Sequence, residues 1–196
     1  GALVRAIEIY ESILREDPRD ILPLKLATYL HFYIGNAAGI RDCAARALPA
    51  WSATVPAYAC LLGMHAFGLE ECGDYAGAER AGRKAVEMNP ADPWSVHAVA
   101  HVLEMQDRRR EGIDWISGLR AHWDACNNFR YHLWWHLAVV HVAHERYDEA
   151  LAVYDASLYD PQSEEYLDLC NDIALLARIE MAGVGVGDRW EKLIDK

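Results

Sequence analysis

The sequence predicts an all-α protein in which tandem tetratricopeptide-like helix-turn-helix repeats form a right-handed superhelical solenoid. Five positions recur along the chain with spacings of 34, 38, 34 and 38 residues: Ala6, Ile40, Ala78, Gly112 and Ala150. Apolar residues follow a helical period between them, and no alternating strand pattern competes. Turn residues separate the helical segments at regular intervals. Together these observations predict stacked pairs of helices.

A 34-residue period is typical of the tetratricopeptide repeat, whose second helix carries a small residue, then an aromatic residue, then a terminating proline. The small residue lets the two helices of a unit approach, and the proline ends the second helix. Three segments have this pattern: Ala6 with Tyr10 before Pro18, Ala150 with Tyr154 before Pro161, and Ala78 before Pro90, with Gly82 in place of the aromatic residue.

Turn chemistry places the helices in order. Pro18 follows the first helix, and Gly73-Asp74 separates two later ones. Asp92 is a suitable N-cap with Pro93 at the first helical position. The glycines at 183, 185 and 187 indicate a flexible turn, because they follow a helix and lack the lysine of a phosphate loop. We expect helices at about 2–16, 21–35, 38–48, 56–72, 75–88, 93–106, 109–123, 130–145, 147–159, 163–182 and 188–195.

We expect one repeat array over residues 1–196, with units at about 1–19 (a half repeat), 20–50, 55–91, 92–125, 130–161 and 163–196. The first unit has only its second helix, and the chain does not begin with Met. An internal repeat has its apolar faces covered by neighbours. We therefore expect a segment of a longer protein, or a homo-oligomer that covers the ends.

Composition narrows the classes of partner. The 196 residues are 53% hydrophobic and 25% charged, with a net charge of -11, which fits a globular protein and argues against nucleic acid as a partner. The sequence contains no membrane-length apolar run and no signal peptide, so no membrane partner is expected. Its five cysteines include no CxxC pair, which favours a reduced cytoplasmic protein.

Two His-x3-His pairs are the candidate chemical site. His97 and His101 form the first pair, and His132 and His136 lie 35 residues further on. Glu104 lies on the same helical face as the first pair. Four such imidazoles on neighbouring groove helices could bind a divalent metal such as zinc. However, the repeat anchors Gly112 and Ala150 are 38 residues apart, so the second pair is about one turn out of register.

The alternative is that these histidines pack at helix contacts. That reading suits His141, which occupies the core aromatic position of its repeat, and His31 is similar. Most of the seven tryptophans should be core for the same reason. Trp135 is the best candidate for a ring that faces the groove, because it lies between His132 and His136.

Several stretches are longer and more specific than the generic repeat consensus. They include Pro49-Ala50-Trp51, Ala66-Phe67-Gly68-Leu69-Glu70, the run from Trp94 to His101, Glu104-Met105, Trp135-His136, Val153-Tyr154-Asp155 and Arg189-Trp190. Nearly the whole chain resembles the tetratricopeptide repeat protein 38 family, and these stretches carry the resemblance. The resemblance implies a tandem helical-repeat protein. It does not imply a particular enzymatic reaction.

Two functions are consistent with the sequence. The first is a binding scaffold that takes a peptide, protein or small ligand in its concave groove through His97, His101, Glu104, His132, Trp135 and His136. Because the groove helices are poor in Lys and Arg, an apolar or cationic ligand is favoured over an acidic one. The second is a metal-dependent or histidine-based enzyme, with Glu104 orienting one of the histidines.

Overall fold

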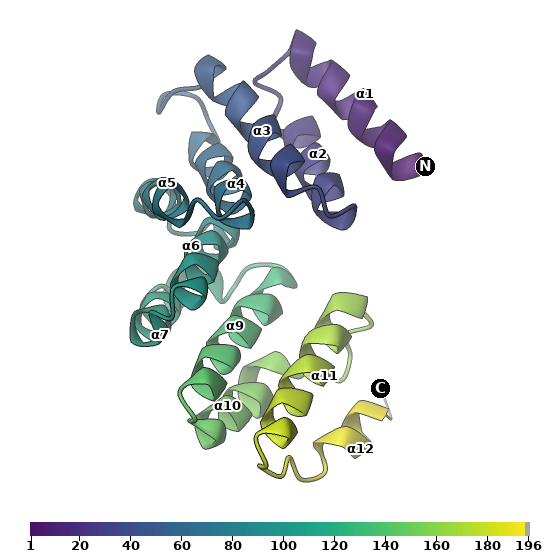
Figure 1. Ribbon diagram of the computed structural model, residues 1–196, viewed down its shortest axis with the longest axis vertical. Coiled ribbons are helices and arrows are strands. Elements are labelled where there is room, and N and C mark those ends of the chain that lie inside the picture. The colour runs from purple at the N-terminus through teal and green to yellow at the C-terminus, as the bar shows by residue number, and fades with distance from the viewer. Residues whose placement is uncertain (195–196) are drawn as a thin grey trace. The chain divides into compact units, whose positions relative to one another are not determined.

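The computed structural model describes residues 1–194, which contain helices and turns and no strand. Figure 1 shows the helices joined by short turns. They are α1 (Ala2–Glu16), α2 (Ile21–Tyr33), α3 (Ala37–Ala47), η1 (Leu48–Ala50), α4 (Tyr58–Glu71), α5 (Tyr75–Met88), α6 (Pro93–Met105), α7 (Arg109–Gly118), α8 (Arg120–Trp123), α9 (Phe129–Ala143), α10 (Tyr147–Val153), η2 (Tyr154–Leu158), α11 (Tyr166–Met181) and α12 (Arg189–Ile194). The predicted all-α class is confirmed.

These helices form two compact units, here called unit 1 (Gly1–Val102) and unit 2 (Leu103–Lys196). The boundary falls within α6. In unit 1, each helix from α1 to α4 packs on the next helix in the chain. In unit 2, α9 packs on α7, α10 and α11. The first helices of successive repeats also meet, α2 with α4 and α9 with α11, so each unit presents a layer of first helices.

The predicted helix boundaries agree with the structure to within a few residues, with two differences inside helices. The helix expected over 109–123 is split at Leu119, just after Gly118, a residue that weakens helices. The helix expected over 147–159 widens into a π-turn at Tyr154–Leu158, where the Tyr159 amide bonds the Tyr154 carbonyl. Residue 195, expected at the end of the last helix, lies outside the described residues.

The core of unit 1 is built from α2, α3 and α4. Leu24, Ala44 and Leu61 are fully buried there. Trp51 is also part of this cluster, and its Nε1 donates to the Pro18 carbonyl at 2.7 Å. Helices α3 and α4 approach closely at Gly68, where an added Cβ would lie 2.5 Å from the Arg41 backbone. This small residue therefore lets the two helices pack at backbone distance.

The core of unit 2 has a tryptophan pair at its centre. Trp123 is fully buried, and its ring lies 5.1 Å from that of Trp134 in an edge-to-face contact. Trp123 Nε1 donates to the Ile116 carbonyl at 3.1 Å, which satisfies its polar atom. Most of the seven tryptophans were expected in the core, but only Trp51, Trp123 and Trp134 are buried, and the other four are half-buried. None of the helices in the described part of the chain is both long and apolar enough to cross a lipid bilayer.

Candidate functional site

The first histidine pair lies on α6 among aromatic rings of unit 1. One helical turn separates His97 from His101, and their ring centroids are 4.2 Å apart. Phe67 of α4 contacts both rings, at 5.5 and 5.7 Å between centroids. Trp94, at the start of α6, makes an edge contact with His97 at 6.1 Å. The pair therefore belongs to an aromatic surface shared by α4 and α6.

Three rings of α2 extend this surface. Tyr29 contacts Trp94 at 6.2 Å between centroids, and Phe32 contacts Phe67 at 6.1 Å. Tyr33 contacts both Tyr29 and Phe32, so the ring contacts close into a loop. We call these seven rings the aromatic face: Tyr29, Phe32, Tyr33, Phe67, Trp94, His97 and His101.

The three α2 rings of the aromatic face are open to solvent. Tyr29 is 36% exposed, Phe32 45% and Tyr33 50%. Such a cluster of exposed rings is unusual, because large apolar side chains bury their surface wherever the fold allows. The α2 part of the aromatic face is therefore accessible to solvent, whereas His97 of α6 is buried.

Lys25 is the one Lys or Arg residue on α2, α4 and α6. Its Nζ lies 3.3 Å from the centroid of the Trp94 ring, a cation–π contact. Burial lowers the pKa of Lys25 to about 8, against an opposing effect of Asp92 and Cys60. Lys25 is therefore largely withdrawn from solvent, with its ammonium held against the Trp94 ring.

Two carboxylates lie beside His101 at the end of α4. Glu70 is buried, with Oε2 3.4 Å from His101 Nδ1, and Glu71 is exposed. One ligand atom from each of Glu70, Glu71 and His101 lies within 4.8 Å of the others. Desolvation, together with the negative charge of Glu70, raises the pKa of Glu71 above its ordinary value.

The second histidine pair lies on α9 in unit 2, where two hydrogen-bonding partners hold it. His132 Nε2 and His136 Nε2 are 3.1 Å apart. His136 Nδ1 lies 3.3 Å from Glu104 Oε2, and Asn171 Nδ2 of α11 lies 3.3 Å from His132 Nδ1. With both rings neutral, one set of tautomers satisfies these three contacts. Asn171 donates to His132, His132 donates to His136, and His136 donates to Glu104.

Trp135 completes the surroundings of the second pair. Its ring stacks on His132 with a 9° angle between planes, and the Arg178 guanidinium lies 5.7 Å from its centroid. Trp135 Nε1 is buried and has no hydrogen-bond partner within the described chain. The ring therefore holds His132 by stacking, while one donor in this part of unit 2 is unsatisfied.

The structure places each residue that the sequence singled out. It brings His97 and His101 together in unit 1, and Glu104, His132, Trp135 and His136 together in unit 2. His31 and His141 are buried, as core packing requires.

Sequence reasoning missed the three α2 rings, the Glu70 carboxylate and Asn171. The spacing of Tyr29, Phe32 and Tyr33, at i, i+3 and i+4, was the available signal for a shared face. Glu70 and Asn171 gave no comparable signal, because each meets its histidine across about 30 to 40 residues of chain.

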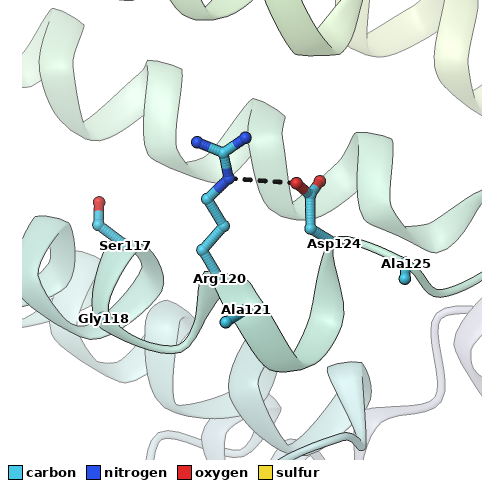
Figure 2. Close-up of a pocket in the computed structure, with 6 residues that line it drawn as sticks. All are labelled: Ser117, Gly118, Arg120, Ala121, Asp124 and Ala125. Atoms are coloured by element: carbon cyan, nitrogen blue, oxygen red, sulfur yellow. Dashed lines mark hydrogen bonds and ion pairs between the residues drawn. The ribbon is translucent and has the colours of Figure 1, made fainter.

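A hollow at the α7–α8 corner of unit 2 is a third candidate (Figure 2). Its chemically active groups pair with their neighbours: Arg120 Nε donates to Asp124 at 3.1 Å, and Trp134 Nε1 donates to the same carboxylate at 2.8 Å. The remaining lining is small: Ser117, Gly118, Ala121 and Ala125. The hollow therefore offers few groups to a ligand.

No family model matches the chain. Among solved structures, it is similar to MamA (TM-score 0.56, 14% identity, 81% of this chain and 82% of that chain). It is also similar to YrrB, a tetratricopeptide repeat protein described as having an unusual peptide-binding site (0.54, 18%, 86% and 82%). A third is BtubC from P. vanneervenii (0.67, 12%, 99% and 86%). At these identities the likeness shows the tetratricopeptide-repeat fold alone.

Proposed function

We propose that this protein is a helical-repeat scaffold that binds a peptide on the aromatic face of unit 1. The exposed rings Tyr29, Phe32 and Tyr33 are the observation that carries the proposal. Contiguous exposed apolar patches mark interaction sites on soluble proteins. The peptide-binding site described for YrrB, a protein of the same fold, supports the general mode of action.

The chemistry of the aromatic face favours a peptide with both apolar and cationic side chains. Aromatic rings bury apolar groups and also attract cations to their faces. The chain has a net charge of -11, and the carboxylates of Glu70 and Glu71 lie next to His101. Lys25 is the one basic side chain on α2, α4 and α6, and its ammonium already contacts the Trp94 ring. A lysine or arginine flanked by apolar residues is therefore the expected ligand.

Selection from a displayed library of random twelve-residue peptides tests this function. The enriched peptides should combine Lys or Arg with apolar residues. The double variant Tyr29→Ser/Phe32→Ser should weaken the dissociation constant at least about tenfold, as expected when aromatic anchors are lost. Ile9→Ser/Ile13→Ser, which removes exposed apolar side chains of α1, is the matched control and should bind normally. Equal affinity in both double variants, or no enrichment, would contradict the proposal.

A second function is favoured by the hydrogen bonds around His132 and His136. We propose that the histidine pairs hold a divalent metal such as zinc, with a role in histidine-based or metal-dependent chemistry. His136 already has the arrangement of a zinc ligand, with Nδ1 held by the Glu104 carboxylate and Nε2 turned to its partner. For His132 to bind through Nε2, its proton must move to Nδ1, and Asn171 must turn its amide oxygen toward that ring.

Metal affinity of Asn171 variants tests the second function. Asn171→Asp should tighten zinc binding, because a carboxylate accepts the His132 Nδ1 proton better than an amide. Asn171→Leu should weaken it by about tenfold or more, the usual loss when an outer partner is removed. His132→Ala/His136→Ala should abolish zinc binding at this pair. No zinc binding by the wild type, or identical affinity in both Asn171 variants, would reduce the pair to a packing role.

Three narrower assignments are proposals as well. We infer membership of the tetratricopeptide repeat protein 38 family from stretches such as Trp94–His101 and Arg189-Trp190. We infer one continuous repeat array over the whole chain from its period of 34 to 38 residues. A cytoplasmic location is supported by five free cysteines. Mass spectrometry after maleimide labelling of unfolded, unreduced protein should show five labels per chain if all five thiols are free.

A further inference from the structure

We propose that Glu70, Glu71 and His101 of unit 1 form a binding site for a divalent transition-metal ion, with Mn²⁺ and Zn²⁺ as the best-suited ions. The site shares His101 with the aromatic face, goes beyond peptide binding, and needs no ligand from the His132/His136 pair. Its three residues come from the end of α4 and the last turns of α6.

The ligand atoms are close enough to share an ion. One oxygen from each carboxylate and one nitrogen of His101 lie within 4.8 Å of one another. Metal–ligand bonds of about 2.0–2.3 Å hold ligand atoms up to roughly 4.5 Å apart around one ion. Small side-chain rotations would therefore bring these three atoms into a common coordination sphere.

The buried Glu70 carboxylate needs a positive partner. Glu70 is 6% exposed, and its Oε2 has no hydrogen-bond partner in the part of the chain that the structure describes. The closest ring nitrogen, His101 Nδ1, lies 3.4 Å away without hydrogen-bond geometry. A buried carboxylate oxygen without a donor is costly, and a coordinated metal ion would remove that cost.

The C-terminal end of helix α4 adds further negative charge beside Glu70, which also favours a bound cation. Helix C-termini carry partial negative charge and favour cations. The last turn of α4 contains no basic residue, and it ends with Glu70 and Glu71 side by side. Two carboxylates at a negative helix end repel each other and the helix dipole. A divalent cation would relieve both repulsions at the same place.

The mixture of ligands selects the kind of ion. Calcium takes six to eight oxygen ligands, which this trio does not offer. Two carboxylate oxygens with one imidazole suit manganese, zinc and related ions, which accept both ligand types. The competing explanation is that His101 alone is the partner of Glu70, in which case the trio binds no metal ion.

Manganese binding should be measured by calorimetry and by loss of the free Mn²⁺ resonance in the His132→Ala/His136→Ala variant. That background removes the unit 2 pair, so failure of the histidine proposal leaves this one testable. We expect binding in the background, and at least about tenfold weaker binding once Glu70→Gln/Glu71→Gln is added. Glu8→Gln/Glu16→Gln on α1 makes the same charge change at exposed carboxylates and should have no effect.

Thermal unfolding provides the second readout. In EDTA the Glu70→Gln/Glu71→Gln variant should be at least as stable as its parent, because it loses the repulsion between the two carboxylates. Added Mn²⁺ should raise the melting temperature of the parent and leave that of the glutamine variant unchanged. If the His132→Ala/His136→Ala background does not fold, the same comparison is made in the wild-type protein. Absence of Mn²⁺ and Zn²⁺ binding, or equal binding by the glutamine variant, would overturn the proposal.

Discussion

At the scale of single residues, five of the nine histidines illustrate three different environments. His97 and His101 are two members of an aromatic surface, while His132 and His136 are connected by hydrogen bonds to an amide and a carboxylate. His141 is buried, and its Nδ1 has no hydrogen-bond partner among the described residues. Histidine thus serves in aromatic ring contacts, in hydrogen bonding and as a buried core side chain.

The third environment predicts a pH effect on stability. Burial lowers the pKa of His141 in the folded protein, and Arg146 lowers it further, against a smaller opposing effect of Glu149. A lowered folded-state pKa means that the stabilisation is complete above the unfolded value, near 6.5, and is lost as the pH falls below it. His141→Phe should therefore lose less stability than the wild type between pH 8 and pH 5.

Urea unfolding at the two pH values measures this difference. His122→Gln changes an exposed histidine of the same unit and is the control, since it should keep the wild-type pH dependence. An identical loss in His141→Phe and the wild type would show that His141 is not held neutral by burial.

Residue-level prediction from sequence succeeded where the signal was local. The spacing of His132, His136 and of His97, His101 gave the two pairs, because positions i and i+4 always share a helix face. The residues that contact these pairs could be predicted only in part. Glu104 was found because it lies on the same helix as the first pair, whereas Glu70 and Asn171 depend on which helices pack together.

At the scale of elements, close helix approach rests on small residues. Gly68 of α4 faces the backbone of α3, where an added Cβ would lie 2.5 Å from Arg41 Cα. A backbone neighbour cannot rotate away as a flexible side chain can. The α3–α4 contact must therefore open to admit even one methyl group.

Gly68→Ala should accordingly destabilise unit 1 by about 1–3 kcal/mol, the usual cost of overpacking, despite the better helix propensity of alanine. Gly118→Ala is the matched control, since no heavy atom lies within 4 Å of the added Cβ and its backbone is helical. That variant should be neutral or stabilised by up to about 1 kcal/mol. Denaturant unfolding gives both values, and equal effects would show that α3 and α4 do not pack as described.

Helix positions followed from the sequence because their ends carry strong local signals. Asp74 accepts from the Gly77 amide and Asp92 from the Trp94 amide, as N-cap residues do. The break at Leu119 and the π-turn after Val153 were not predicted, because the apolar period continues through both. The first interruption follows Gly118, and the chain just after it buries Trp123.

At the scale of the whole molecule, the tetratricopeptide fold combines repeated small-residue packing with a layer of first helices. The repeat spacing predicted that fold, and the structure confirms it. The function depends on which side chains that layer presents. In unit 1 it presents exposed aromatic rings where a purely structural layer would bury them, so binding on that face is the central claim.

Photo-crosslinking tests that claim most directly. The photoreactive residue p-benzoylphenylalanine should replace Phe32 on the aromatic face in one protein and Ile9 on α1 in another; both positions are exposed. Each protein is irradiated with the tightest peptide from the library selection, and the products are analysed by mass spectrometry. The account predicts efficient crosslinking at position 32 and little at position 9. Crosslinking at position 9 with none at position 32 would place the peptide elsewhere and contradict it.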